Sequence, residues 1–156
     1  TRHKIMAKVK SQLYYEAVGR RKSAVARVRL YVVTGKEKSI LVKGVKISTG
    51  EMTVNKKPIS TLFSSIEEKV RYLSPLKLTN NEGRFGISIV VKGGGRTGQL
   101  DALIHGLARA IEKVDKDQYR PDLKKAGLLT RDPRVRERRK VGTGGRARRQ
   151  KQSPKR

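Results

Sequence analysis

Positive charge is concentrated at the two ends of the chain, and this distribution limits which part can form a folded core. Residues 1–10 contain four basic residues and no acidic one, and residues 131–156 contain twelve basic and two acidic residues. Both ends are poor in apolar side chains, so neither can bury enough surface to offset the entropy lost on ordering. We expect a basic N-terminal extension (1–10), a globular domain (11–130) and an extended basic tail (131–156).

The whole chain has a formal net charge of +26. A compact protein of that charge repels itself, which favours a polyanionic partner, most commonly nucleic acid. A membrane is the alternative, but the sequence has no basic amphipathic helix, no lipidation signal and no apolar run of about 18 residues. With no cysteine and two histidines, the chain offers no pattern for a metal site. We predict no membrane contact, no cofactor, no metal and no enzymatic activity.

Alternation of apolar and other residues predicts strands in the first half of the domain. From residue 24 to residue 33, every second residue is small or apolar and can face a core. The intervening positions place Arg27 and Arg29 side by side on the opposite face. Further strands are expected at 14–18, 40–42, 52–54 and 85–91, the last apolar enough to be central in a sheet.

Two longer helices are expected, one before and one after the strand at 85–91. Ser64 and Ser65 stand three residues before Glu67 and Glu68, a capping-box pattern. Helical spacing then predicts a buried stripe, and Pro75 is expected to end this helix. The stripe consists of Phe63, Ile66, Val70 and Leu73.

The second helix has the clearest apolar stripe in the chain. The stripe consists of Leu100, Leu103, Ile104, Leu107, Ile111 and Val114. Residues 114–120 are interpreted as a polar loop, and 121–126 as a short helix ended by Gly127. This order of strands and helices predicts an α+β fold, a small mixed sheet with helices on one face.

A glycine-rich turn at residues 93–98 matches the pattern GxGxxG between a predicted strand and a predicted helix. Glycines let backbone N–H groups approach a phosphate, and a helix N-terminus favours an anion. Lys92 and Arg96 flank the turn, so an RNA phosphate suits it. A dinucleotide is the alternative ligand, but the second parallel strand of that unit is missing from the sequence. A tight turn without a ligand is the third interpretation.

Arg20, Arg21 and Lys22 form a second basic motif, on a turn between two predicted strands. Adjacent cations on a turn can straddle phosphates, although a solvated hairpin turn is an equally good interpretation. His105 and Arg109 share one face of the second helix. A lone histidine without a partner nucleophile or carboxylate in a suggestive pattern indicates a structural or RNA-facing role.

The tail is rich in arginine, which favours bidentate phosphate contacts over a diffuse charge effect. Its glycines and prolines keep it extendable. Fully extended, its 26 residues could span on the order of 85 Å, which lets it reach into a large RNA.

Several stretches together resemble the small-subunit ribosomal protein S9 family of bacterial type. They are residues 15–28 (YEAVGRRKSAVARV), 91–95 (VKGGG) with Gly98 and Gln99, 105–110 (HGLARA), 120–132 (RPDLKKAGLLTRD) with Glu137 and Arg138, and the terminal pair Lys155 and Arg156. The resemblance covers about residues 12–156. The stretch from about 34 to 53 looks longer than the usual turn of the family.

The resemblance implies a sandwich like the second domain of ribosomal protein S5, with a left-handed βαβ crossover. It implies a structural constituent of the small ribosomal subunit that binds rRNA in the head beside neighbouring head proteins, and that is not a homo-oligomer. It further implies that the tail reaches P-site tRNA, with Lys155 and Arg156 at the contact. We expect a cytoplasmic location in the ribosome, with a plastid or mitochondrial ribosome as the alternative.

Combining the motifs with the resemblance gives a set of residues expected to bind rRNA. The set is Arg20, Arg21, Lys22, Arg27, Arg29, Lys92, Gly93, Gly94, Gly95, Arg96, Arg109, Arg131, Arg134, Arg136, Arg138, Arg139, Lys140, Arg146, Arg148 and Arg149. The competing hypotheses are a non-ribosomal DNA-binding protein and a nucleotide-binding enzyme that uses residues 93–98.

Overall fold

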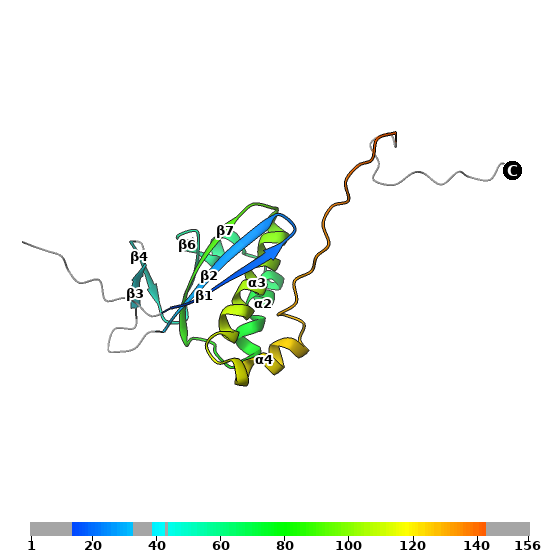
Figure 1. The fold of residues 1–156 in the computed structure, drawn as a ribbon. Coiled ribbons are helices and arrows are strands. Elements are labelled where there is room, and N and C mark those ends of the chain that lie inside the picture. Colours follow the sequence, from blue (N-terminus) through cyan, green and yellow to red (C-terminus); the bar gives the residue numbers. More distant parts are fainter. Residues whose placement is uncertain (1–13, 33–38, 43, 143–156) are drawn as a thin grey trace, which may run out of the picture.

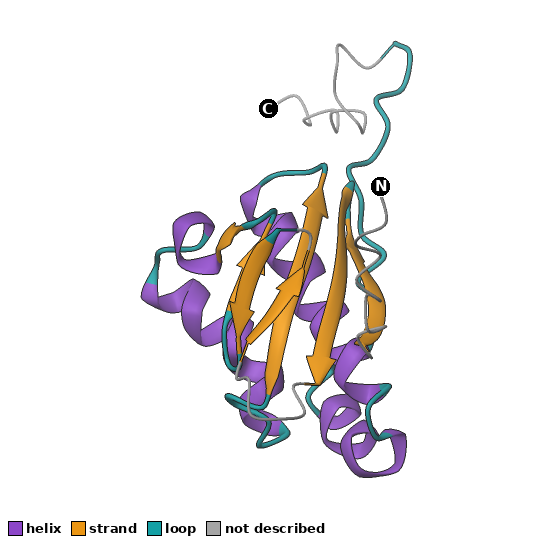
Figure 2. Ribbon diagram, turned by 90° about the vertical axis from the view of Figure 1, so that its left-hand side faces the viewer, coloured by secondary structure: helices purple, strands orange, loops and turns teal. Residues whose placement is uncertain are grey.

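A computed structural model describes residues 14–32, 39–42 and 44–142 of the chain. Within this part, one sheet has the strand order β1-β2-β7-β5-β6. The helices lie on one side of it, and a separate hairpin lies on the other side (Figures 1 and 2). The predicted α+β class, a mixed sheet with helices, is confirmed.

Strands β1 (Tyr14–Arg21) and β2 (Ala24–Val32) form an antiparallel hairpin, and β2 also pairs antiparallel with β7 (Phe85–Lys92). The alternation predicted for residues 24–33 is confirmed as far as Leu30, because Ala24, Ala26, Val28 and Leu30 are fully buried; Tyr31 is also buried. Strand β7 lies third of five and is central, as expected. One face of the hairpin therefore enters the core, and the other carries Arg27 and Arg29.

The short strand β5 (Met52–Val54) pairs parallel with β7, and β6 (Lys57–Pro58) pairs antiparallel with β5. Asn55 ends the parallel pairing: its side-chain amide donates to the Val91 carbonyl, and its side-chain oxygen accepts the Val91 N–H. Between β6 and β7 the chain forms α1 (Ile59–Leu62) and α2 (Ile66–Leu78). The parallel strands are thus joined by a helical crossover, which makes the sheet mixed.

Helix α2 begins at the predicted capping box, formed by Ser65 and Glu68. The predicted end at Pro75 is wrong, since the helix continues to Leu78. Proline has no N–H for the carbonyl of Arg71 one turn earlier. The hydroxyl of Ser74 donates to that carbonyl at 2.8 Å instead, so the group stays satisfied and the helix can pass through the proline.

The apolar stripe predicted for α2 is only partly correct: Phe63 is buried and Leu73 packs against the core, but the other two residues face solvent. Ile66 and Val70 are 82% and 56% exposed, and the buried residues of the helix are Tyr72, Pro75 and Leu76. Both sets have helical spacing, so local periodicity alone could not distinguish them. The choice depends on which face meets α3, a contact between distant parts of the chain.

Helix α3 (Arg96–Glu112) is the main helix of the core, and its predicted stripe is confirmed from Leu100 to Ile111. It packs against β1 and β2 through glycine contacts. A Cβ added to Gly19 would lie 2.0 Å from the Ala102 carbonyl oxygen and 2.3 Å from the Gly106 nitrogen. The strand and helix backbones can approach this closely only because Gly19 has no side chain.

Helix α4 (Lys116–Lys125) begins earlier than expected, so the interpretation of residues 114–120 as a loop is wrong. Asp115 caps the helix by accepting the backbone N–H of Gln118 at 3.1 Å. Pro121 lies inside the helix, and Gly127 follows it with φ +71°. An N-cap carboxylate followed by polar helix-compatible residues was the signal for the earlier start.

Strands β3 (Ser39–Val42) and β4 (Val45–Ser48) form a hairpin of their own. The sequence predicted the first of these strands but not the second. Ile47 is buried, and its side chain would be 3.4 Å from a Cβ added to Gly86 of β7. The hairpin therefore covers part of the sheet face opposite the helices.

Candidate nucleic-acid interface

The two basic motifs found in the sequence lie next to each other at one end of the sheet. The register pairs Arg21 with Ala24 and Val25 with Lys92, which places the β1–β2 turn beside the end of β7. A Cβ added to Gly93 would lie 2.6 Å from the Ser23 carbonyl oxygen. Residues 20–23 and 92–98 together form what we call the basic end.

Backbone geometry in the glycine loop suits a phosphate. Gly93 and Gly94 have φ of +71° and +67°, a conformation that favours glycine. Helix α3 starts directly after the loop, its N-cap Gly95 makes no side-chain capping bond, and its first turn holds no acidic residue. The first N–H groups of the helix and its dipole therefore favour an anion at this position.

No second parallel strand follows α3 in the described residues, because the chain continues into α4. A dinucleotide-binding loop needs that second parallel strand. The described structure therefore does not support the dinucleotide interpretation, in agreement with the sequence. The described residues contain no group of three side chains suited to holding a metal ion. They also contain no helix that is long and apolar enough to cross a membrane.

Several of the expected rRNA-binding cations already have carboxylate partners. Arg96 makes a bidentate pair with Glu68 at 2.8 and 2.7 Å, and these bonds hold the pKa of Glu68 below its ordinary value. Arg29 pairs with Glu16 at 2.5 Å. Exposed ion pairs are weak, so a phosphate can compete for such a guanidinium, but it has to displace the carboxylate first.

Arg21 is largely enclosed, and it holds the first residues of the tail. Its guanidinium lies 3.0 Å from Asp132 and 3.5 Å from Asp101, and it donates to the backbone carbonyl of Arg134 at 3.0 Å. Hydrogen bonds from Arg134 hold the pKa of Asp132 well below its usual range. We call Arg21, Asp101, Asp132 and Arg134 the tail root.

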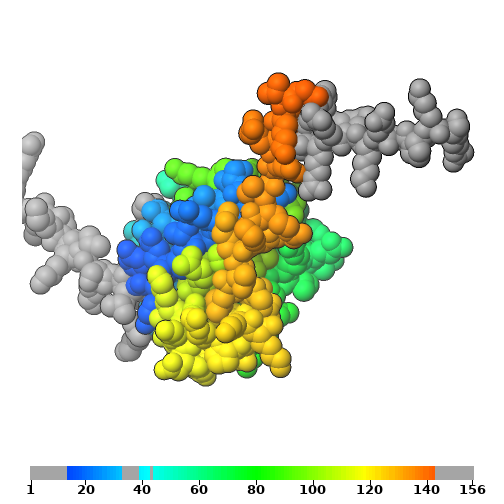
Figure 3. Space-filling model, turned by 45° about the vertical axis from the view of Figure 1, so that its right-hand side comes forward, coloured from blue at the N-terminus to red at the C-terminus, as the bar shows by residue number. Residues whose placement is uncertain are grey.

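The chain beyond the tail root runs over the domain surface and then leaves it (Figure 3). The cations expected to bind rRNA in this part are exposed. They are Arg131, Arg134, Arg136, Arg138, Arg139 and Lys140. Arg146, Arg148, Arg149, Lys155 and Arg156 lie outside the described residues, as does the N-terminal extension.

His105 connects three segments. Its Nδ1 accepts the backbone N–H of Arg20 at 3.4 Å, and its Nε2 lies 3.2 Å from the Leu129 carbonyl oxygen. Nε2 therefore carries the proton of a neutral ring. Burial lowers the pKa of His105, the charges of Arg109 and Arg131 lower it further, and the Leu129 carbonyl acts in the opposite direction. This histidine has a structural role in the fold.

Arg109 and Lys113 follow His105 at intervals of four residues and bind the same strand. Arg109 donates to the Val18 carbonyl at 2.6 Å, and Lys113 donates to the Glu16 carbonyl at 2.7 Å. Four helical residues rise about 6 Å and two strand residues about 6.7 Å, so the two spacings match. The outer edge of β1 is thus capped by a side-chain ladder from α3, which the sequence analysis missed despite the spacing of four.

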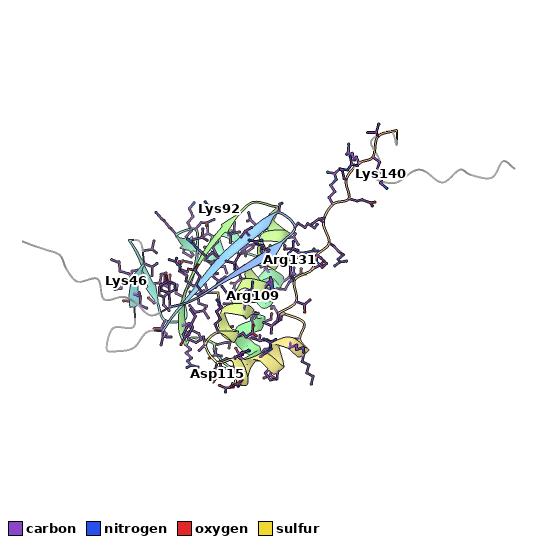
Figure 4. All side chains as sticks on the ribbon, viewed as in Figure 1. Lys46, Lys92, Arg109, Asp115, Arg131 and Lys140 are labelled. Carbon is purple, nitrogen blue, oxygen red and sulfur yellow. The ribbon has the colours of Figure 1, made fainter. Side chains whose placement is uncertain are left out.

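Figure 4 shows how the labelled charges are distributed. Lys92 lies at the basic end, Lys140 on the projecting tail, and Asp115 at the opposite end of the domain. Arg109 lies between these ends, along the edge of the sheet. Lys22 and Lys92 are exposed at the basic end, and Gly93, Gly94 and Gly95 are exposed beside them.

A comparison with protein families gives a match that covers most of the chain. The model described as ribosomal protein S9/S16 matches residues 19–156. The chain belongs to the ribosomal protein S9/S16 family. It is also 42% identical over 134 residues to the small ribosomal subunit protein uS9 of Dehalococcoides mccartyi, covering 86% of this chain and 89% of that protein.

Membership of the S9/S16 family confirms the resemblance stated from the sequence motifs. A member of this family is a structural component of the small ribosomal subunit and not an enzyme. The alternatives of a nucleotide-binding enzyme and a non-ribosomal DNA-binding protein are thereby excluded. The expected location in the ribosome is confirmed as well.

Proposed function

We propose that this S9/S16 protein binds rRNA in the head of the small subunit through its basic end, and that its tail extends this contact to P-site tRNA. One observation carries the proposal: two basic motifs about 70 residues apart in the sequence, 20–23 and 92–98, meet beside the tail root. Phosphates bound there lie close to the start of the tail. Neighbouring head proteins are the further partners, and the chain acts as a single copy.

In this proposal, contacts with phosphates provide most of the binding. The chain has many cationic side chains and few aromatic side chains that could stack on bases. The sequence has only seven aromatic residues, five tyrosines and two phenylalanines. If about ten phosphates are neutralised, the affinity for rRNA falls with a log–log salt slope of about −7 to −9. A slope shallower than about −3 would contradict phosphate-dominated binding.

The assembly role can be tested by cosedimentation of the tagged chain with ribosomal particles in high-salt sucrose gradients, beside a variant that lacks residues 131–156. We expect both to travel with the small subunit, because the globular domain provides the anchor. Finding neither protein with the small subunit would reject anchoring by the domain. If only the full-length chain travels with the small subunit, the tail and not the globular domain provides the main contact.

The basic end can be tested with the double variant Lys22→Gln/Arg96→Gln and a control of equal charge, Lys116→Gln/Lys124→Gln. The control lysines are exposed on α4. Losing two phosphate contacts should reduce the magnitude of the salt slope by about 1.4–1.8 in the first variant only. Equal losses in both variants would indicate a diffuse charge effect without a defined surface.

The tRNA contact rests on the family resemblance of the terminal pair Lys155 and Arg156. Deleting these two residues removes two cations and leaves the rest of the tail intact. We expect subunits with this deletion to assemble normally and to bind P-site tRNA more weakly. Unchanged tRNA affinity in filter-binding assays would show that Lys155 and Arg156 do not contribute to tRNA binding. The proposed rRNA binding would not be affected by that result.

A further inference from the structure

The described residues cover only part of the sheet face opposite the helices. The β3–β4 hairpin covers it near Gly86, where Ile47 packs against β7. Between the hairpin and the sheet a groove of about 790 Å³ remains, lined by residues of β1, β2, β5 and β7 and by hairpin residues Val42, Val45 and Ile47. Val25 lies on its floor and is 38% exposed, although its strand is paired on both sides.

Valines and cations alternate on this open face in both directions. The strand register places Arg20, Val25 and Lys92 in one row across the three strands. The next row consists of Val18, Arg27 and Val90. Each valine therefore has cations beside it along its strand and across to the next one. We call these six residues the valine–cation face.

The cations of this face are free of carboxylates. Among the described residues, Arg20, Arg27 and Lys92 make no ion pair, and neither does Lys56 on the groove rim. None of the described residues that line the groove is an aspartate or glutamate. This sets the face apart from Arg21, Arg29 and Arg96, whose guanidinium groups are all paired. An anion can bind here without displacing a carboxylate.

The partner of such a face needs negative charges and apolar surface at alternating positions. The Cα atoms of neighbouring cationic residues on the diagonal are about 7–8 Å apart, so these residues suit a series of phosphates better than one carboxylate. Double-stranded RNA presents phosphates but keeps its base faces stacked inside, whereas an unpaired nucleotide presents both. An acidic peptide gains little here, because the middle of a sheet face has no free backbone N–H groups to offer it.

We propose that the valine–cation face is a binding site for unpaired rRNA nucleotides. Their phosphates bind Arg20, Arg27 and Lys92, and a base or ribose packs against the valines. This inference rests on the proposed rRNA-binding function and extends it. Arg20 and Lys92 also belong to the basic end, so a strand bound at the glycine loop continues directly onto this face. Binding on aliphatic floor residues fits a chain with few aromatic side chains.

The test distinguishes the contribution of the valines from that of the cations, because only the cationic contribution to RNA affinity depends on salt concentration. The full-length chain and the floor variant Val25→Ser/Val90→Ser are titrated with fluorescent single-stranded oligouridine and with duplex RNA over a range of salt concentrations. Removing the valines should weaken oligouridine binding about fivefold at every salt concentration, with the slope unchanged, because apolar contact does not involve counterions. Duplex binding should not change.

The cation variant Arg27→Gln/Lys92→Gln should instead flatten the oligouridine slope by about 1.4, at about 0.7 per phosphate on a single strand. The matched control is Ile66→Ser/Val70→Ser, which removes exposed apolar side chains from α2. This control should leave oligouridine binding unchanged. Thermal unfolding of each variant checks that the fold is retained.

The outcomes distinguish this inference from the function on which it rests. Suppose that the floor variant binds oligouridine normally while Lys22→Gln/Arg96→Gln flattens the salt slope of RNA binding. The proposed nucleotide site on the valine–cation face is then wrong, and rRNA binding by the basic end is retained. If neither pair of cations affects the slope, both proposals fail. Normal RNA binding by the floor variant together with its exclusion from reconstituted subunits would assign the face to a protein neighbour and overturn the inference.

Discussion

Gly19 determines how closely β1 can approach α3. The nearest atoms to an added Cβ belong to the helix backbone, at Ala102 and Gly106, and backbone cannot rotate away as a long side chain can. Gly106 has the complementary restriction, since its own Cβ would lie 2.9 Å from a Val28 methyl group. Two glycines on different elements thus create one contact.

The contact predicts a large stability loss from a single methyl group. Gly19→Ala should lower the free energy of unfolding by about 3 kcal/mol, at the upper end for overpacked sites, because strand and helix must separate. The control is Gly95→Ala, at a position with φ −98° and open space around its Cβ. That change should cost about 1 kcal/mol or less, the difference between glycine and alanine at an N-cap. Similar urea midpoints for the two variants would contradict the close approach.

At the level of elements, the ladder from α3 to β1 gives Arg109 a role different from the one inferred from sequence. The sequence placed it among rRNA-binding residues, whereas its guanidinium caps the Val18 carbonyl on the sheet edge. Closing this edge also protects the protein from pairing with another chain. Binding to rRNA through Arg109 remains a prediction that competes with this structural contact.

The two roles of Arg109 predict different measurements. As an edge cap, Arg109→Met should lower the unfolding free energy by about 1 kcal/mol, because it removes one charged hydrogen bond at an exposed site, and should leave the rRNA salt slope unchanged. As a phosphate contact, the same change should flatten the slope by about 0.7–0.9 and leave stability intact. Lys116→Met, on an exposed helix position, is the control for both assays.

The elements that the sequence predicted correctly are those with strong local periodicity. Strands β2 and β7 and helix α3 combine alternating or 3.6-residue patterns with deep burial. Helix α2 continues beyond Pro75 because the Ser74 hydroxyl donates to the Arg71 carbonyl, which the proline leaves without a backbone donor. Helix propensities do not account for such a side-chain hydrogen bond. Strand β4 and helix α1 were missed because they are four residues long and are stabilised by tertiary contacts.

The candidate site was predictable in composition but not in arrangement. The sequence identified both basic motifs and the tail, since clustered cations and glycines are local signals. Their convergence depends on strand register between residues about 70 positions apart. The enclosure of Arg21 by Asp101 and Asp132 could not be anticipated either, because its partners lie on α3 and the tail root.

For the molecule as a whole, the tail root fixes the direction in which the tail leaves the domain. Breaking it should let the tail sample more orientations. The chain has no cysteine, so spin labels can be placed at Val70→Cys and Val135→Cys, two exposed positions on the domain and the tail. Asp132→Asn should broaden the measured distance distribution between them. The control Asp117→Asn, on exposed α4, should leave the distribution as narrow as in the parent, and equal widths in all three proteins would argue against an anchored tail.

The ladder and the tail root also have a consequence for biosynthesis. Val18 is bound by Arg109, 91 residues later, and Arg21 by the carbonyl of Arg134, 113 residues later. At about 5–20 residues per second, the nascent chain therefore waits roughly 6–23 s between the synthesis of Arg21 and that of its last partner. The first strand has no cap on its edge until Arg109 and Lys113 have been synthesised. The hairpin of β1 and β2 is therefore made long before the residues that fix its outer edge and the start of the tail.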